Sequence, residues 1–111
     1  MWRLQDRAAF AELRRSGRRR RCGPLDVVWV DGPATRPPRV AFAISRRVGP
    51  AVVRNRVRRR LRAVAAEMAA TGGLAPGDYL VAAAPAAAAA SFATLRSGMI
   101  TACAEFLGRT R

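Results

Sequence analysis

The sequence predicts one small domain of the α+β class, and three observations support this class. The chain has 111 residues, of which 50% are hydrophobic, enough to build a core in a domain of this length. Three segments carry apolar residues at steps of three and four, the spacing of a helix that buries one face. Three shorter apolar runs lie between these segments and predict strands, the first rich in β-branched and aromatic residues and the second alternating between two faces.

The N-terminal part is predicted to form a helix, a turn and a first strand. Residues 2–15 carry Leu4, Ala8 and Ala11 at helical spacing, and Ser16 and Gly17 end this helix. The four consecutive arginines of residues 18–21 repel one another and predict a turn in solvent. This turn is either merely solvated or in contact with phosphates, and the neighbouring basic segments favour contact. Residues 25–31 (LDVVWVD) predict the strand.

Residues 39–46 predict a second strand, which we expect to pair with the first as a hairpin. Between the two strands, Asp31-Gly32-Pro33 and Pro37-Pro38 mark a turn. Alternation places Val40, Phe42 and Ile44 on one face of the second strand. The other face carries Ala41, Ala43 and Ser45. These small side chains leave either an open, shallow surface for something flat or extended, or a packing surface beneath a helix.

The next helix is predicted to begin at the Gly49-Pro50 turn, and it carries an unusual load of charge. Its buried stripe consists of Val53, Val57, Leu61, Val64, Ala65 and Met68. Six arginines within residues 54–62, together with Asn55, cover nearly all of the remaining circumference, and no acid follows until Glu67. Each like-charge pair four residues apart costs about 0.2–0.5 kcal/mol, and cations in the first turn oppose the helix dipole. This pattern predicts that the helix binds an anion.

The C-terminal part is predicted to form a third strand and a third helix. Thr71-Gly72-Gly73 ends the charged helix, and residues 78–84 predict the strand. The alanine-rich residues 85–90 form a connector or a first helical turn, and Ser91 is a suitable N-cap. The last helix ends at Gly108, and its core stripe consists of Phe92, Leu95, Met99, Cys103 and Phe106.

The charge of the chain predicts a polyanionic partner. Its 21 basic and 7 acidic residues give a net charge of +14, which attracts nucleic acid first and anionic membranes second. Every basic residue is an arginine, whose planar guanidinium suits phosphates and bases. A G+C-rich coding sequence is the simpler cause of this bias. The arginine side chains can bind phosphates and bases under either cause.

Composition argues against an active site or a metal site built from protein side chains. The chain has no histidine, and its seven acids are scattered without a metal-binding or acid/base spacing. Cys22 and Cys103 lie far apart and predict reduced, inert thiols. Residues 1–15 mix charges into their apolar residues, unlike a signal peptide. The longest apolar run, residues 79–90, is broken by Pro85 and is too short to span a bilayer. We therefore expect a soluble, cytoplasmic protein.

Within the stretch AFAISRRVGPAVVRNRVRRRLR, Ser45 to Arg62 closely resembles the signature of the protein subunit of bacterial ribonuclease P. The core of the signature is Val53-Arg54-Asn55-Arg56-Val57, followed by Arg58 and Arg59. This core lies on a predicted helix. A strand that ends in serine and two cations precedes it, followed by a Val-Gly-x-Ala turn. The order of these three features makes the resemblance specific. A looser resemblance covers nearly the whole chain.

The resemblance implies a fold and a role. The fold is a small two-layer α/β sandwich in which a mixed sheet packs with about three helices and includes a left-handed β-α-β crossover, all within one RNA-binding domain, residues 1–111. In the family, the RNA subunit cleaves the 5′ leader from precursor tRNA, and the protein assists by binding that RNA and the leader. Mg²⁺ is bound mainly by the RNA subunit and the substrate, and the protein itself requires no cofactor, membrane or obligatory protein partner.

Two RNA-facing surfaces are implied, and neither contains a catalytic residue or a metal ligand. The surface for the RNA subunit comprises Arg46, Arg47, Arg54, Asn55, Arg56, Arg58, Arg59 and Arg62. The cleft for the single-stranded leader comprises Phe10, Arg14, Trp29 and Ser45. Arg14 stands where the family often has a second phenylalanine, and Arg60 replaces a usual hydrophobic residue. From the residues alone, Phe10 and Trp29 are more typical of a core than of a cleft.

Other functions remain open at this point. A ribosomal or general RNA-binding protein would use the same chemistry without a role in cleavage. A helix that reads DNA bases usually gathers arginine with Gln, Asn or Ser on one narrow face, whereas these cations surround the helix. The polar face of the charged helix would suit a membrane surface, but its apolar stripe lacks the Trp or Phe that anchors such helices. A protein nuclease without RNA is the weakest alternative.

Overall fold

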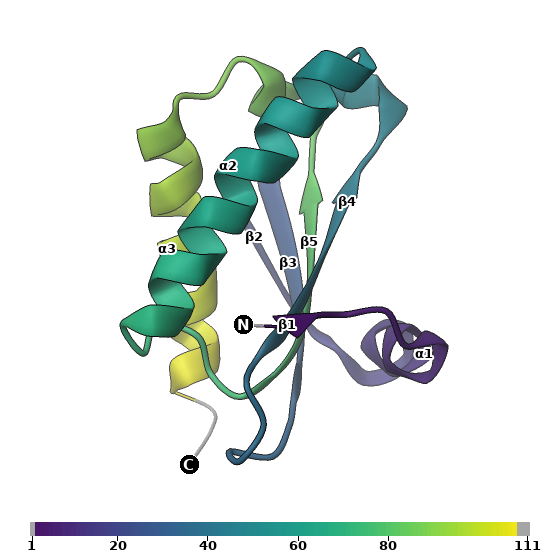
Figure 1. Ribbon diagram of the computed structural model, residues 1–111, viewed down its shortest axis with the longest axis vertical. Helices are drawn as coiled ribbons and strands as arrows, with labels where there is room; N and C mark the ends of the chain where they lie inside the picture. Colours follow the sequence, from purple (N-terminus) through teal and green to yellow (C-terminus); the bar gives the residue numbers. More distant parts are fainter. Residues whose placement is uncertain (1, 109–111) are drawn as a thin grey trace.

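The computed structural model describes residues 2–108, and its strands form one mixed sheet in the order β1-β4-β5-β3-β2 (Figure 1). The sheet is parallel where β4 meets β1 and β5, and antiparallel where β3 meets β5 and β2. The strands are β1 (Trp2–Arg3), β2 (Arg18–Cys22), β3 (Leu25–Asp31), β4 (Arg39–Ile44) and β5 (Gly77–Ala83). The helices are α1 (Arg7–Ser16), α2 (Ala51–Ala70) and α3 (Phe92–Leu107), with short 3-10 helices η1 (Arg46–Val48) and η2 (Pro85–Ala88). The α+β class is confirmed.

Helices lie on both faces of the sheet. In Figure 1, α2 and α3 lie together on one side, and α1 lies on the other side near one end. The larger core forms under α2 and α3, where the Trp29 ring of β3 stacks on Phe106 of α3 with centroids 5.2 Å apart. The smaller core forms under α1, where Leu13 packs near Val28 and Leu80. The sandwich implied by the resemblance thus describes the α2/α3 layer on the sheet, and α1 adds a partial layer opposite.

The connection from β4 through α2 to β5 is a left-handed crossover. In Figure 1 the chain ascends β4, descends α2 in front of the sheet and ascends β5 to the left of β4. About 98% of such connections are right-handed, so hydrophobic periodicity alone could not have predicted a left-handed crossover. It agrees with the crossover that the family resemblance implies.

The pairing of the first half of the chain differs from the sequence-based expectation. Helix α1 begins at Arg7, with Asp6 as its N-cap, and not at residue 2. The arginine run is a strand rather than a turn, because β3 offers it a full backbone ladder from Arg18 opposite Trp29 to Cys22 opposite Leu25. The expected hairpin of residues 25–31 and 39–46 is also wrong. Strand β5 lies between β3 and β4, where Tyr79 and Val81 are fully buried.

The second half of the chain follows the expectation more closely. Helix α2 buries Val57, Leu61 and the rest of the predicted stripe, with Val53 only half-buried. The hydroxyl of Ser91 accepts a hydrogen bond from the Thr94 amide and caps α3 as expected. The α3 stripe is buried from Leu95 onward, whereas Phe92 remains 41% exposed. Both cysteines are free thiols, and burial raises the pKa of Cys103 to about 12, which keeps it protonated.

Gly17 allows α1 to end directly against the sheet. A Cβ added at Gly17 would lie 2.3 Å from the Leu13 carbonyl oxygen and 2.4 Å from Cγ1 of Val28, closer than real contacts allow. We expect Gly17→Ala to lower the free energy of unfolding by about 1–3 kcal/mol because α1 must shift from β3. Urea denaturation measures the change. Gly108→Ala is the control, since a Cβ there meets its nearest atom at 3.6 Å. Equal stability of the two variants would contradict the close packing of α1.

Candidate nucleic-acid interface

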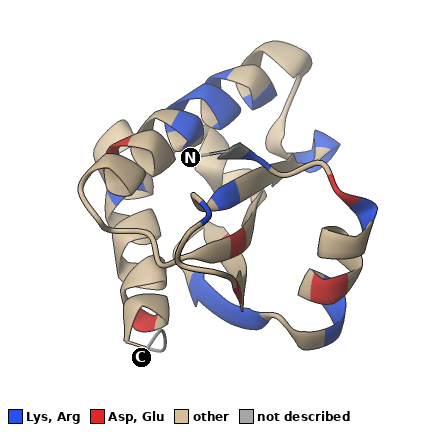
Figure 2. Cartoon of the chain, turned by 60° about the horizontal axis from the view of Figure 1, so that its bottom comes forward, with Lys and Arg blue, Asp and Glu red and all other residues tan. Residues whose placement is uncertain are grey.

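Helix α2 presents a cationic surface because its apolar stripe fixes which side faces the sheet. Val57, Leu61 and Val64 are almost completely buried, so the other positions of the helix are turned away from the core. Figure 2 shows arginine along much of this helix, with acidic residues sparse over the whole chain. The first turn of α2 contains no acid. The sequence pattern alone predicted this surface correctly.

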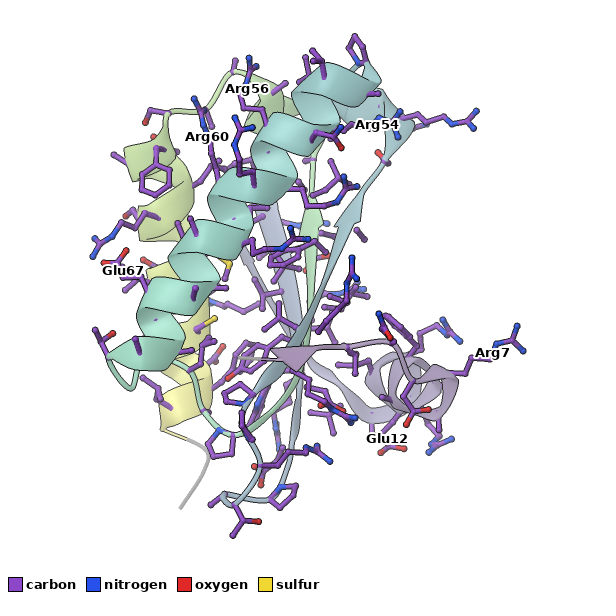
Figure 3. The ribbon with its side chains drawn as sticks, in the orientation of Figure 1. Arg7, Glu12, Arg54, Arg56, Arg60 and Glu67 are labelled. Atoms are coloured by element: carbon purple, nitrogen blue, oxygen red, sulfur yellow. The ribbon has the colours of Figure 1, made fainter. Side chains whose placement is uncertain are left out.

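The arginines of α2 leave the helix in different directions. Arg54, Arg58 and Arg62 follow one another at intervals of four, and Arg58 and Arg62 line a groove beside β4. Nε of Arg54 donates to the Gly49 carbonyl at 3.2 Å, which holds its side chain at the start of the helix. Nη1 of Arg58 donates to Oδ1 of Asn55 at 2.9 Å. Figure 3 shows Arg54 on the opposite side of α2 from Arg56 and Arg60.

Arg56 faces the last residue of η2, and Arg60 faces the linker between η2 and α3. Nη2 of Arg56 donates to the Ala88 carbonyl, and Nη1 of Arg60 donates to the Ala90 carbonyl, each at 3.4 Å. Both side chains are half-buried, and within residues 2–108 the buried Nε of Arg56 has no hydrogen-bond partner. Arg56, expected in the RNA-facing surface, therefore also fastens α2 to the end of η2. Arg60, which departs from the family pattern, fastens α2 to the linker that follows.

The positive charge of this surface is not neutralised within the described part of the chain. None of the six α2 arginines forms an ion pair with a described carboxylate. The one acid of the helix, Glu67, instead pairs with Arg96 of α3 at 2.6 Å. Ser45, Arg46 and Arg47 are exposed at the N-terminal end of α2, as are Asn55, Arg59 and Arg62 along the helix. The structure thus gathers the expected RNA-subunit residues around α2 and η1.

A groove of about 560 Å³ lies along the edge of the sheet. It exists because β1 pairs with Arg39 and Val40, so that the rest of β4 forms the sheet edge. The residues lining this groove come from β1, the segment that follows it, α1, β4 and α2: Arg3, Leu4, Phe10, Val40, Ala41, Phe42, Arg58 and Arg62. The half-buried Phe10 is therefore placed in a cleft, and this cleft adjoins the cationic side of α2.

The α1 face of the sheet is covered at one end and open at the other. Ala41 packs with the small core under α1, whereas Ala43 and Ser45 on the same face are exposed. Both expectations for these small residues are thus met on one face of the strand: Ala41 packs beneath a helix, and Ala43 and Ser45 leave an open surface. Ser45 lies at the open end, close to η1, and α1 does not cover it.

A second groove, of about 530 Å³, continues on this face between α1 and β2. Leu13, Arg14, Gly17, Arg19, Val28 and Leu80 line it. Phe10 and Arg14 lie one helical turn apart on α1, so the two grooves adjoin along this helix. Arg14 is found where the leader cleft was expected. Arg19 lines this groove too, although the arginine run was expected as a turn that contacts phosphates and none of its residues was assigned to the leader cleft.

Trp29 does not belong to the leader cleft. It is 2% exposed, and its Nε1 donates to the Pro76 carbonyl at 3.2 Å. Alternation along β3 turns Trp29 toward α2 and α3, on the opposite side of the sheet from Phe10 and Arg14. The cleft face of β3 instead carries Val28 and Val30. The expectation for Trp29 is therefore corrected: it is a core residue.

The site supplies charge and apolar surface. Within residues 2–108, no three His, Cys, Asp or Glu side chains gather in a way that could hold a metal ion. In the same part of the chain, no helix is long and apolar enough to cross a membrane.

Comparison with known proteins assigns the family. The ribonuclease P family model matches residues 1–107. The chain belongs to the ribonuclease P protein family. The ribonuclease P protein component of Nocardioides sp. is 45% identical over 97 residues, covering 84% of this chain and 80% of that protein. The component of Acidothermus cellulolyticus is 47% identical over 97 residues, covering 85% and 78%. The protein is thus a subunit of the ribonuclease P holoenzyme, which processes the 5′ ends of tRNA.

Solved structures share the fold at low sequence identity. The RNase P protein of Staphylococcus aureus superposes with a TM-score of 0.80 at 16% identity, covering 100% of this chain and 99% of that chain. The RNase P protein of Thermotoga maritima gives 0.76 at 20% identity, covering 91% and 94%. The family assignment favours the ribonuclease P role over a general RNA-binding role.

Proposed function

We propose that α2 and η1 dock this protein on the ribonuclease P RNA, while the grooves beside α1 hold the 5′ leader of precursor tRNA. The unneutralised arginines of α2 are the observation that carries this proposal, because they lower the stability of the isolated helix unless an anion relieves them. Closely spaced RNA phosphates supply that anion. The RNA then carries out the cleavage, and the protein contributes binding.

The leader half of the proposal rests on Phe10 and the open sheet face. Unpaired bases stack on aromatic rings for about 1–3 kcal/mol each. The groove with Phe10 lies beside Arg58 and Arg62, so a strand bound there remains close to the RNA docked on α2. Precursor tRNA is the substrate that presents an unpaired 5′ extension next to the catalytic RNA. A role on newly made precursor tRNA supports a cytoplasmic location for the protein.

Mg²⁺ belongs to the RNA side of the proposal. The acidic residues within positions 2–108 do not gather into a metal site, which supports the proposal that Mg²⁺ is bound mainly by the RNA subunit and the substrate. The protein instead neutralises phosphates that would otherwise require cations. We expect it to lower the Mg²⁺ concentration that the RNA subunit needs to fold and to dock its substrate.

Cleavage of precursor tRNA at low Mg²⁺ by the RNA subunit of the same organism tests the proposal. We expect the protein to restore cleavage at the mature 5′ end. We expect Phe10→Leu, which keeps aliphatic packing and removes the aromatic ring, to weaken holoenzyme binding to precursor tRNA about tenfold. Its binding to mature tRNA, which has no leader, serves as the control and remains unchanged. Protein that binds the RNA yet leaves cleavage unaltered would instead indicate a general RNA-binding protein.

A further inference from the structure

Phe92, the first residue of α3, keeps its aromatic ring open to solvent. Helical spacing predicted it as the first member of the α3 core stripe, yet it is 41% exposed, whereas Leu95, three residues later, is fully buried. Within residues 2–108 no other aromatic ring stacks on Phe92, since both ring pairs of this part of the chain involve Phe106. Neither the core nor the grooves beside α1 include this ring.

The Phe92 side chain lies on the side of α3 that faces α2. Arg96 follows it by four residues, one turn along the same face of α3. Nη2 of Arg96 donates to Oε1 of Glu67 on α2 at 2.6 Å, so this face of α3 is turned toward α2. Figure 3 shows Arg56, Arg60 and Glu67 following one another along the side of α2 next to α3. The ring of Phe92 therefore belongs to the outer surface where the two helices meet.

Arg60 and Arg56 bring positive charge to the start of this surface. Nη1 of Arg60 donates at 3.4 Å to the carbonyl of Ala90, which precedes Phe92 by only two residues. Nη2 of Arg56, one turn earlier on α2, donates to the Ala88 carbonyl. These acceptors are neutral, and neither arginine forms an ion pair with a described carboxylate. A guanidinium has five N–H donors, so a bond to one carbonyl leaves others for a phosphate.

The α2 side of this surface carries no large side chain between Arg60 and Glu67. The residue that lies on this side between them is Ala63, which is small and exposed. An open aromatic ring is thus bordered by a small residue and by cations that keep their charge. Unpaired bases stack on such rings while nearby arginines contact their phosphates.

We infer that the Phe92 ring stacks on an unpaired base of the ribonuclease P RNA and that Arg60 binds a phosphate of the same nucleotide. This inference rests on the proposed docking of that RNA on α2. The exposed Arg59 adjoins Arg60 and connects the ring to the docking surface. The first groove proposed for the leader meets α2 at Arg58 and Arg62, on the other side of the helix from Arg60. A second copy of the chain would bring its own uncompensated arginines to the same place and be repelled.

Binding of the protein to the ribonuclease P RNA of the same organism, without precursor tRNA, tests the inference. We expect Phe92→Leu, which keeps an aliphatic side chain, to weaken binding about tenfold because one stacked base is lost. Phe92→Trp retains the affinity, since either ring can stack. The logarithmic salt slope of Phe92→Leu stays unchanged, because no phosphate contact is removed. Ile100→Ala, which removes another exposed hydrophobic side chain two turns farther along α3, is the matched control and leaves the affinity unchanged.

Two further measurements connect the ring and the cation to one nucleotide. Arg60→Gln, which keeps a donor for the Ala90 carbonyl, lowers the logarithmic salt slope by about 0.7, and its loss of affinity adds less than fully to that of Phe92→Leu. Chemical probing of the RNA at saturating protein shows an unpaired nucleotide that wild-type protein and Phe92→Trp protect and Phe92→Leu leaves reactive. Thermal unfolding confirms that the variants are folded.

Three results would overturn the inference. The first is wild-type affinity of Phe92→Leu for the RNA, which would leave the docking of α2 intact. The second is a loss confined to holoenzyme binding of precursor tRNA, which would assign the stacked base to the precursor. The third is a self-association of the free protein in sedimentation that Phe92→Leu abolishes, which would assign the ring to a second copy. Failure of the wild-type protein to bind the RNA at all is a separate outcome, which would contradict the proposed function.

Discussion

Replacing Arg59 and Arg62 with alanine is expected to weaken binding to the ribonuclease P RNA roughly 100-fold at moderate salt. Both side chains are exposed on α2, and neither forms a hydrogen bond or ion pair with another described residue that would be lost with it. The change would therefore remove the proposed contacts to RNA and leave the fold intact. Charge-assisted hydrogen bonds contribute about 1.5 kcal/mol or more each, and two of them account for the expected loss.

Salt dependence gives this prediction a second readout. If the protein neutralises about five phosphates, its affinity for the RNA falls several-hundredfold between about 50 and 200 mM salt. Each lost phosphate contact lowers the logarithmic salt slope by about one, so the double variant loses about two. Filter binding or fluorescence anisotropy over a salt series measures both quantities.

The matched control for this experiment lies on β2. Arg18→Ala with Arg20→Ala removes the same charge at the opposite edge of the sheet from β4, next to α3 rather than α2. We expect a much smaller loss of affinity for the RNA subunit. An affinity indifferent to salt, or equal losses in the two double variants, would contradict docking through α2. Arg56 and Arg60 are less suitable probes, because their side chains also hold the end of η2 and the linker before α3.

The α2 surface could be predicted from the sequence because its information is local. A stripe at helical spacing determines which positions are buried, and neighbouring positions then necessarily point outward. Val57, Leu61 and Val64 are buried as this pattern predicts, and the arginines between them face away from the core, as expected for the group. Their individual directions depended on the linker after β5, which lies about thirty residues away in sequence. The fastening of Arg56 to Ala88 was therefore not predictable.

The sheet could be predicted only in part because strand pairing depends on distant segments. β3 and β4 were each expected at nearly the correct positions, but β5 enters between them from much later in the chain. The face of a strand residue also depends on this arrangement. Trp29 was assigned to the cleft through the family resemblance, although strand alternation and a second aromatic ring, Phe106, hold it in the core. Arg19 was not assigned to a groove for the corresponding reason, since its position there requires β2 to pair with β3.

Asp78 is the clearest case of a residue whose role only the structure reveals. Among scattered acids it had no assigned function, yet it is 7% exposed and lies on β5 opposite Arg39 of β4. Oδ1 and Oδ2 of Asp78 accept hydrogen bonds from Nε and Nη2 of Arg39, both at 2.8 Å, and Arg36 approaches Oδ1 at 3.4 Å. The hydrogen bonds to Asp78 raise the pKa of Arg39. This group joins β5 to the start of β4, the strand that lines the first groove.

Asp78→Ala is expected to lower the free energy of unfolding by about 3 kcal/mol, because it leaves the largely buried guanidinium of Arg39 without its partner. Urea denaturation measures the loss, and Asp31→Ala, at an exposed carboxylate on β3, is expected to cost only about 0.5 kcal/mol. The double variant Asp78→Ala with Arg39→Ala should regain part of the stability, since no unpaired charge then remains buried. A double variant no more stable than Asp78→Ala alone would show that Asp78 acts through packing at the β4–β5 junction rather than through its charge.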